Sequence, residues 1–212
     1  MWGARESNEV NKIEKLPASK WGDDPGPLAL IALLQGILGV AVGLAIWWAT
    51  GRDVFAFVTW QSRDIFIGAI TAVVLLLAMQ SIVFAFPNFL RWAADQQRML
   101  FEHGRCYSRL HISMISFGAG VGEEAMFRGG LQTLLGDHLP PWVAIGLVGL
   151  VFAALHWGSR GVFAFIFTIS AVFGGVFYLT GSLLSSMIGH VAFDVWALTM
   201  VQREFVRQGM VR

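Results

Sequence analysis

Residues 28–49 of the sequence read LALIALLQGILGVAVGLAIWWA, and residues 65–86 read IFIGAITAVVLLLAMQSIVFAF. Neither stretch contains a charged residue. An α-helix rises about 1.5 Å per residue and the hydrocarbon core of a bilayer is about 30 Å thick, so about 20 apolar residues suffice to cross it. Each stretch is therefore predicted to be a membrane-spanning helix.

Four further segments extend this pattern. Residues 140–157 and 161–179 contain no Asp, Glu, Lys or Arg, whereas 110–135 and 182–201 are apolar but carry ionisable side chains. We therefore expect an all-α fold, a polytopic membrane helix bundle of about six transmembrane helices. Residues 87–109 alternate apolar and charged positions at helical spacing, which predicts an amphipathic helix on the cytoplasmic side, with a solvated loop helix as the alternative.

The composition points to the same class of protein. The 212 residues are 56% hydrophobic and 14% charged, whereas soluble domains have about 25% charged residues. A net charge of +1 provides no basic surface for nucleic acid. The single cysteine, Cys106, excludes a disulfide framework and a cysteine-based zinc site.

The distribution of Lys and Arg predicts the orientation. If the N-terminus is cytoplasmic, twelve of the 15 cations lie on the cytoplasmic side, Arg52 and Arg63 lie outside, and Arg128 lies within a span. By the positive-inside rule, both termini are expected in the cytoplasm, and a bacterial inner membrane is the expected location. The twelve are Arg5, Lys12, Lys15, Lys20, Arg91, Arg98, Arg105, Arg109, Arg160, Arg203, Arg207 and Arg212.

Glycine spacing offers a weaker signal. Gly39 and Gly43 form one G-x-x-x-G pattern, and Gly118 and Gly122 form another. Such spacing is typical of closely packed membrane helices, although chance explains it nearly as well in a glycine-rich chain.

A small group of ionisable side chains lies inside the predicted spans. Burying a charge in a bilayer costs at least about 2.5–3.5 kcal/mol, so such residues need an explanation. They are Glu123, Glu124, Arg128, His156, His190 and Asp194.

The first cluster lies in the third predicted span. Glu124 and Arg128 are four residues apart and share a helix face, where they can neutralise each other. Glu123 points about 100° away from that face. A carboxylate in apolar surroundings without a cation suits a general base, which makes Glu123 the candidate. The alternative is an ion pair that only holds helices together.

Two further clusters contain histidine. Phe152 and His156 are four apart, so the phenyl ring can wall one side of the imidazole, although a lone interfacial histidine is the simpler interpretation. Asp194 can accept a hydrogen bond from one nitrogen of His190 and leave the other free for substrate or metal. A buried pair that only links helices is the alternative.

In chain order these residues spell E-E-x-x-x-R at 123–128, F-x-x-x-H at 152–156 and H-x-x-x-D at 190–194. The pattern resembles the CAAX-protease and bacteriocin-processing family of intramembrane endopeptidases, which includes the type II CAAX prenyl endopeptidases. The resemblance covers about residues 110–201. It implies hydrolysis of a peptide bond in a membrane-anchored peptide or protein substrate, such as a prenylated or leader-bearing one.

The resemblance also implies roles and a division of the chain. Glu123 and His156 would activate water, and His190 with Asp194 would stabilise the oxyanion. The implied supporting residues are Glu124, Arg128 and Phe152. The expected organisation is a polar cytoplasmic tail (1–27), two accessory transmembrane helices with the interfacial helix (28–109), a catalytic four-helix membrane core (110–201) and a cytoplasmic tail (202–212).

One departure leaves the cofactor open. The prenyl-processing relatives have Asn at the position of Asp194, and a carboxylate cannot donate to an oxyanion as an amide can. Asp194 therefore either orients His190 or helps to bind a metal. Glu123, His156, His190 and Asp194 could hold Zn²⁺, and the sequence does not decide between a metallopeptidase and a glutamate-dependent enzyme.

Other functions leave different traces. The sequence has no H-E-x-x-H and no G-x-S-x-G motif, and Asp194 is the only aspartate within a predicted catalytic span. The remaining alternatives are a non-catalytic membrane partner, such as a bacteriocin-immunity protein, and a proton-coupled transporter. The absence of an internal repeat makes the transporter less natural.

The predicted depths of the site residues disagree. Counting along the spans places His156 near the cytoplasmic end, but Glu123 and His190 nearer the middle. Either the glycines before Glu123 break the third span, or the helix that carries His156 extends beyond Trp157.

Overall fold

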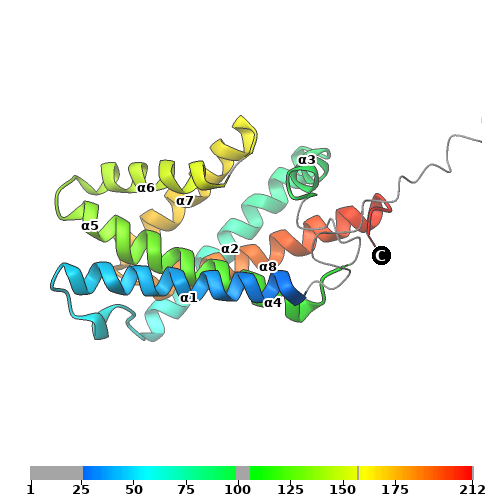
Figure 1. Ribbon diagram of the computed structural model, residues 1–212. Coiled ribbons are helices and arrows are strands. Elements are labelled where there is room, and N and C mark those ends of the chain that lie inside the picture. Colours follow the sequence, from blue (N-terminus) through cyan, green and yellow to red (C-terminus); the bar gives the residue numbers. More distant parts are fainter. Residues whose placement is uncertain (1–25, 99–105, 157, 212) are drawn as a thin grey trace, which may run out of the picture.

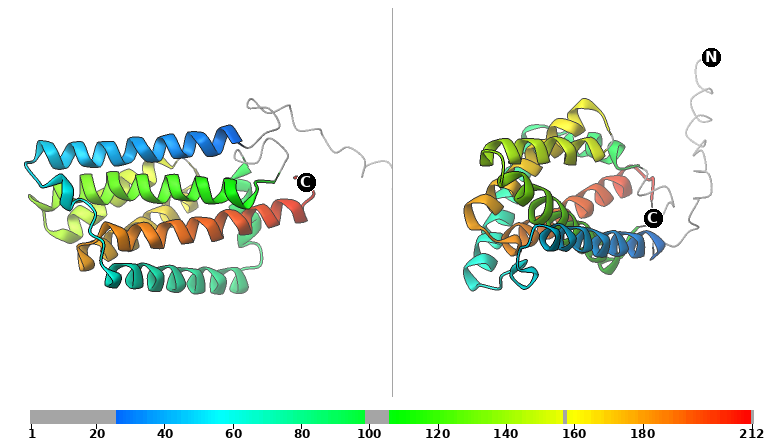
Figure 2. Two further views of the ribbon diagram at one scale, coloured as in Figure 1. Left: turned by 90° about the horizontal axis from the view of Figure 1, so that it is seen from below. Right: turned by 60° about the vertical axis from the view of Figure 1, so that its left-hand side comes forward.

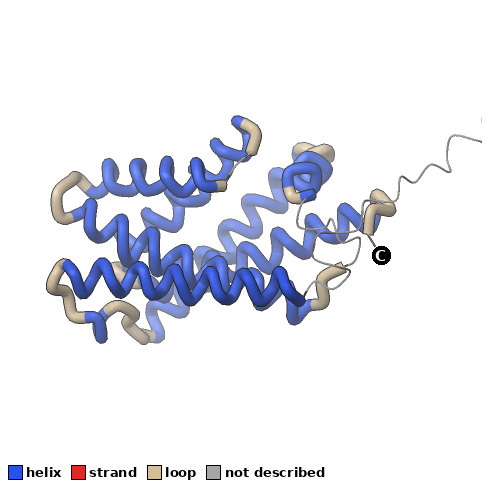
Figure 3. The backbone as a smooth tube through the Cα atoms, in the orientation of Figure 1, coloured by secondary structure: helices blue, strands red, loops and turns tan. Residues whose placement is uncertain are grey.

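Long apolar helices form the frame of the protein (Figure 1). The computed structural model describes residues 26–98, 106–156 and 158–211, and these are helical apart from connecting loops, with no strand among them (Figure 3). The predicted all-α fold is confirmed. Four helices are long and apolar enough to cross a membrane: α1 (Gly26–Ala49), α2 (Ser62–Ala85), α7 (Arg160–Thr180) and α8 (Leu183–Arg207).

The other two predicted spans take different forms. The first is a composite helix in which α4 (Arg109–Glu124) continues into a π-helical segment (Ala125–Gln132) and then α5 (Thr133–Gly136). The second is α6 (Pro141–Leu155), which has only 15 residues. At about 1.5 Å per residue, α6 is about 22 Å long and shorter than the hydrocarbon core. Among the described residues, four single helices thus have both spanning length and composition, compared with about six spans predicted. The composite helix reaches spanning length only as α4, the π-helical segment and α5 together.

Local sequence signals define several helix ends. The Ser108 side chain accepts a hydrogen bond from the backbone N–H of His111 at the start of α4, and Ser159 caps α7 through Val162 in the same way. Gly181 ends α7 in the left-handed conformation, with φ of 66°. Ser108 and Ser159 therefore mark where α4 and α7 begin, and Gly181 marks where α7 ends.

Helix α1 lies against α4 at backbone distance (Figure 2). A Cβ atom at Gly39 would clash with the backbone of Gly122, and one at Gly118 would clash with that of Ala32. The glycine patterns therefore do mark a close helix contact, as the spacing indicated. Since α2 packs in turn on α8, the two predicted accessory helices flank the elements that carry Glu123 and His190.

A short helix, α3 (Phe89–Gln96), occupies part of the predicted amphipathic segment 87–109. Residues 99–105 of that segment lie outside the described part of the chain. Helix α3 packs against α8, and its Phe89 ring lies 6.1 Å from that of Phe165 in α7. The segment is therefore helical over Phe89–Gln96 and joined to the bundle by aromatic contact.

The start of α1 and the end of α8 lie at the same end of the bundle (Figure 2). This arrangement agrees with a prediction that places both termini on one side of the membrane. Most of the predicted tail 1–27 lies outside the described residues. Helix α8 continues to Arg207, so the predicted tail 202–212 begins as part of the last helix.

Candidate active site

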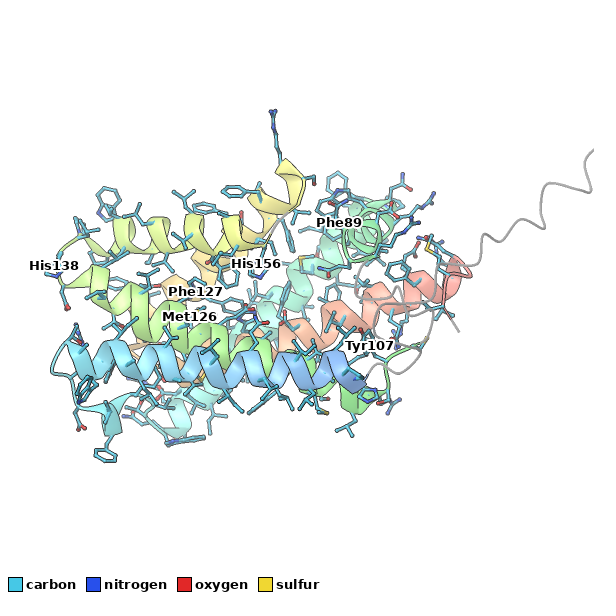
Figure 4. The ribbon with its side chains drawn as sticks, viewed as in Figure 1. Phe89, Tyr107, Met126, Phe127, His138 and His156 are labelled. Atoms are coloured by element: carbon cyan, nitrogen blue, oxygen red, sulfur yellow. The ribbon has the colours of Figure 1, made fainter. Side chains whose placement is uncertain are left out.

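The three sequence motifs meet inside the bundle. Glu123 and Glu124 occupy the last turn of α4, His156 directly follows α6, and His190 and Asp194 lie within α8. Figure 4 places His156 between the two ends of the bundle, one of which is marked by His138. The predicted site residues, from three separate helical segments, are therefore neighbours in space.

Glu123 is the shared centre of the cluster. Its Oε2 atom lies 4.0 Å from Nε2 of His156 and 3.9 Å from Nε2 of His190. The side chains of Glu123 and His190 are 13% and 7% exposed, whereas that of His156 is 35% exposed. The carboxylate therefore sits between two imidazoles, with His156 on the more open side.

The hydrogen bond of His156 defines its tautomer. Its Nδ1 atom lies 2.7 Å from the backbone oxygen of Phe152, and a carbonyl oxygen can only accept. Nδ1 therefore carries the proton, and a neutral His156 presents the lone pair of Nε2 to Glu123. The Phe152 ring lies 4.3 Å from the imidazole, so the predicted contact between these two side chains is present.

The hydrogen-bond partner of His190 lies on α4, whereas the sequence suggested a partner on the same helix as His190. Its Nδ1 atom lies 2.9 Å from Oε1 of Glu124, while its Nε2 atom lies 3.6 Å from Oδ2 of Asp194. The orienting hydrogen bond is therefore made by Glu124 and not by Asp194. The spacing of four along α8 brings Asp194 beside the opposite nitrogen, and only the packing of α4 on α8 brings Glu124 to Nδ1.

Glu124 and Arg128 form the expected ion pair. Nε of Arg128 lies 3.3 Å from Oε2 of Glu124, and the two side chains are 1% and 0% exposed. The guanidinium also lies over the Phe152 ring, 5.5 Å from its centroid. A buried carboxylate that binds both a cation and an imidazole is a rigid support for His190.

The helix changes register directly after Glu124, so that Arg128 lies in the π-helical part. In the π-helical segment Ala125–Gln132, the indole of Trp47 donates to the Gly129 carbonyl at 2.6 Å, and the hydroxyl of Thr133 donates to the Arg128 carbonyl at 2.9 Å. Such segments are frequent at functional sites. Helix α4 remains continuous before it, so the expectation that the glycines break this span is wrong.

The short length of α6 explains the apparent disagreement in depth. The helix ends at Leu155, and Figure 4 shows His156, the next residue, partway along the length of the bundle instead of at its end. The helix does not extend past Trp157, since His156 already takes a non-helical conformation. A helix too short to cross a bilayer thus brings its last residue to the depth of Glu123.

Two contacts of the site were not expected from the sequence. Ser170 of α7 accepts a hydrogen bond from Nη2 of Arg128 at 3.1 Å. Phe173 stacks on His190, with ring centroids 4.8 Å apart and planes at 13°. A serine in the uncharged span 161–179 was a possible signal, although Thr168 also carries a hydroxyl there. No signal distinguished Phe173 from its phenylalanine neighbours.

The donor atoms are of a type that zinc accepts, but their spacing is wide. Tetrahedral zinc with ligand distances of about 2.0–2.2 Å keeps neighbouring donors about 3.3–3.6 Å apart. Glu123 Oε2 is instead 4.0 and 3.9 Å from the two histidines. The part of the chain that the structure describes contains no group of three or more His, Cys, Asp or Glu positioned for a metal ion. This arrangement does not fit zinc.

Comparison with known proteins gives two matches. The model of the family described as type II CAAX prenyl endopeptidase Rce1-like matches residues 107–196. The protein YpbD of Bacillus subtilis (strain 168), which is described as uncharacterised, is 30% identical over 163 residues, covering 74% of this chain and 79% of that protein. No solved structure matches. The family match contains every residue of the three motifs.

Proposed function

Because the chain belongs to the Rce1-like family of type II CAAX prenyl endopeptidases, a family of CAAX-type intramembrane proteases, we propose that it hydrolyses peptide bonds of membrane-anchored proteins. Glu123 and His156 activate the water, and His190 stabilises the oxyanion. The observation that carries this proposal is the separation of 4.0 Å between Glu123 Oε2 and His156 Nε2.

That separation suits one water molecule. A water with hydrogen bonds of about 2.8 Å to both atoms, at an angle of about 90°, spans about 4.0 Å. Since Nδ1 of His156 is occupied by the Phe152 carbonyl, Nε2 is the nitrogen available to this water. The partial exposure of His156 supports entry of the water from its side of the cluster.

The reaction then proceeds with these side chains alone. Glu123 accepts a proton from the water as the water oxygen bonds to the scissile carbonyl carbon, and the carbonyl oxygen takes up the negative charge. Glu123 next donates that proton to the leaving amide nitrogen as the carbon–nitrogen bond breaks. The remaining hydroxyl proton of the former water passes to the amine, which leaves a carboxylate and an ammonium group, so no external reactant besides water is needed.

His190 is the donor for the oxyanion. In its protonated form it donates from Nδ1 to Glu124, at 2.9 Å, and from Nε2 toward the space beside Glu123. A charged donor placed in advance, in surroundings that exclude bulk water, is an effective way to stabilise developing negative charge. Oδ2 of Asp194 lies 3.6 Å from Nε2 of His190. We propose that the role of Asp194 is to keep this nitrogen protonated until the oxyanion forms.

The spacing of the donors also favours a glutamate-dependent mechanism over a zinc-dependent one. We propose that the substrate of this protein is another protein, which is held at the membrane by a prenyl group or a hydrophobic leader. With both termini in the cytoplasm, as the distribution of Lys and Arg predicts, the end of α6 at His156 faces the cytoplasmic half of the bundle.

The test uses mass spectrometry to compare the membrane peptides of two kinds of cells. One kind produces the wild-type protein and the other produces the Glu123→Gln variant. The amide keeps the size of the side chain but cannot accept the proton. We expect peptides released by the wild type to be missing with Glu123→Gln, at equal protein levels. Equal release by both proteins would contradict the proposal, and a transport or immunity phenotype that survives Glu123→Gln would favour a non-catalytic role.

A further inference from the structure

Helix α7 contacts the site through one face. Ser170 and Phe173 are three residues apart, and their exposed fractions are 1% and 0%. Residues at this spacing lie on the same side of a helix, and both side chains point at groups of the site. Ser170 contacts Arg128, and Phe173 contacts His190. The two side chains therefore influence the reaction through these residues and not through Glu123 or His156 directly.

Ser170 is the first member of a series of buried contacts. Its hydroxyl accepts from Nη2 of Arg128 at 3.1 Å, Nε of Arg128 faces Glu124 at 3.3 Å, and Glu124 accepts from Nδ1 of His190 at 2.9 Å. A guanidinium has five N–H donors and needs acceptors wherever it is buried. Ser170 supplies one of them, which fixes the plane in which Arg128 meets Glu124.

Phe173 controls the remaining freedom of His190. The hydrogen bond to Glu124 holds Nδ1 at one point, but it leaves the imidazole free to tilt about that bond. The Phe173 ring lies nearly parallel to the imidazole, at 4.8 Å and 13°, and it is fully buried, where close packing restricts the movement of side chains. A tilt of His190 would force the two rings to overlap.

We infer that Ser170 and Phe173 are positioning residues that together aim Nε2 of His190 at the reacting carbonyl. The inference rests on the proposed function, because it assigns the two side chains a task in oxyanion stabilisation. A hydrogen-bond series fixes where the imidazole is anchored, and a stacked ring fixes its plane. Displacement of a catalytic group by a fraction of an ångström is enough to slow a reaction.

Ser170→Ala tests the first contact. The substrate is a quenched fluorescent peptide that contains the cleavage sequence found by the peptide comparison with Glu123→Gln, and the protein is reconstituted in lipid vesicles. We expect kcat to fall about tenfold with KM unchanged, which corresponds to about 1.4 kcal/mol. Ser170→Thr keeps the hydroxyl and should restore kcat.

Thr168→Ala is the matched control. Thr168 is exposed on the same helix, and its hydroxyl donates to the Ala164 carbonyl of α7 itself. Removal of this hydroxyl should leave kcat and KM unchanged. Wild-type kcat for Ser170→Ala, or equal losses for Ser170→Ala and Thr168→Ala, would overturn the inference.

Phe173→Leu tests the second contact, with Phe163→Leu as its control because Phe163 is 38% exposed on α7. We expect a loss of kcat of about tenfold for Phe173→Leu alone, again without a change in KM. An increase in KM with unchanged kcat would mean that Phe173 shapes substrate binding instead, and would overturn its assigned role.

A measurement without substrate separates this inference from the proposed function. Nitrogen NMR of isotope-labelled histidine side chains reports the hydrogen bond at Nδ1 of His190. We expect the His190 signals to shift in Ser170→Ala and to stay in place in Thr168→Ala. Unshifted signals in Ser170→Ala overturn the inference even if the wild type cleaves peptides. Absence of cleavage by the wild type overturns the proposed function and, with it, any positioning role in catalysis.

Discussion

Nδ1 of His190 on α8 lies 2.9 Å from Oε1 of Glu124 on α4. This hydrogen bond joins the two helices through residues that are 66 positions apart in the sequence. The other oxygen of Glu124 faces Arg128 at 3.3 Å. Glu124 therefore has two partners of potential positive charge and is itself fully buried. The carboxylate of Glu124 therefore connects the first motif, which contains Arg128, to His190 of the third motif.

Replacement of Glu124 should damage both the fold and the activity. Glu124→Ala leaves Arg128 buried without its carboxylate, and breaking a buried pair in this way costs about 3–5 kcal/mol. Glu124→Gln retains a carbonyl acceptor for one partner and should be less destabilised. Thermal unfolding in detergent measures the difference, and equal melting temperatures for the wild type and Glu124→Ala would contradict the assigned support.

Asp194→Asn should retain activity. The side chain lies 3.6 Å from Nε2 of His190. Asparagine loses the charge that we assign to keeping this nitrogen protonated, but its amide can itself donate to the oxyanion instead. Asp194→Ala removes both possibilities and should lower kcat by about tenfold, the equivalent of one hydrogen bond. Peptide cleavage by the purified variants provides the measurement. Inactive Asp194→Asn protein would mean that the charge of Asp194 is needed in the reaction.

Gly39→Leu should separate α1 from α4 and destabilise the protein. A Cβ atom at Gly39 already clashes with the backbone of Gly122, which cannot yield as a flexible side chain can. Overpacking of this kind costs about 1–3 kcal/mol or more. Gly146→Leu is the matched control in α6, because a Cβ there meets nothing within 4 Å. Equal thermal stability of the two variants would show that the close contact is not needed.

Removal of metal ions should leave the activity unchanged. Nε2 of His156 and Oε2 of Glu123 are 4.0 Å apart, which is wider than the separation of about 3.3–3.6 Å for donors around tetrahedral zinc. Peptide cleavage before and after treatment with EDTA, with metal analysis of the same purified sample, checks this expectation. A loss of activity that added zinc restores would establish a metal requirement.

Much of the architecture could be predicted from single segments. A helix in a bilayer must satisfy its own backbone, so apolar length alone identifies α1, α2, α7 and α8. Residues 110–135 and 140–157 were also expected as spans, yet the structure has a composite helix and a short one there. An apolar segment indicates where a helix forms. It does not predict that residues 125–132 become π-helical or that α6 ends at Leu155.

By itself, the sequence determined the membrane class and the residues of the site. Charge is so costly in a bilayer that the few ionisable side chains inside it, such as Glu123 and His190, stand out by position alone. Only the tertiary structure decided how they are paired. Spacing along one helix relates Asp194 to His190, but contacts between helices depend on packing, and these bring Glu124 to Nδ1 and Phe173 onto the imidazole.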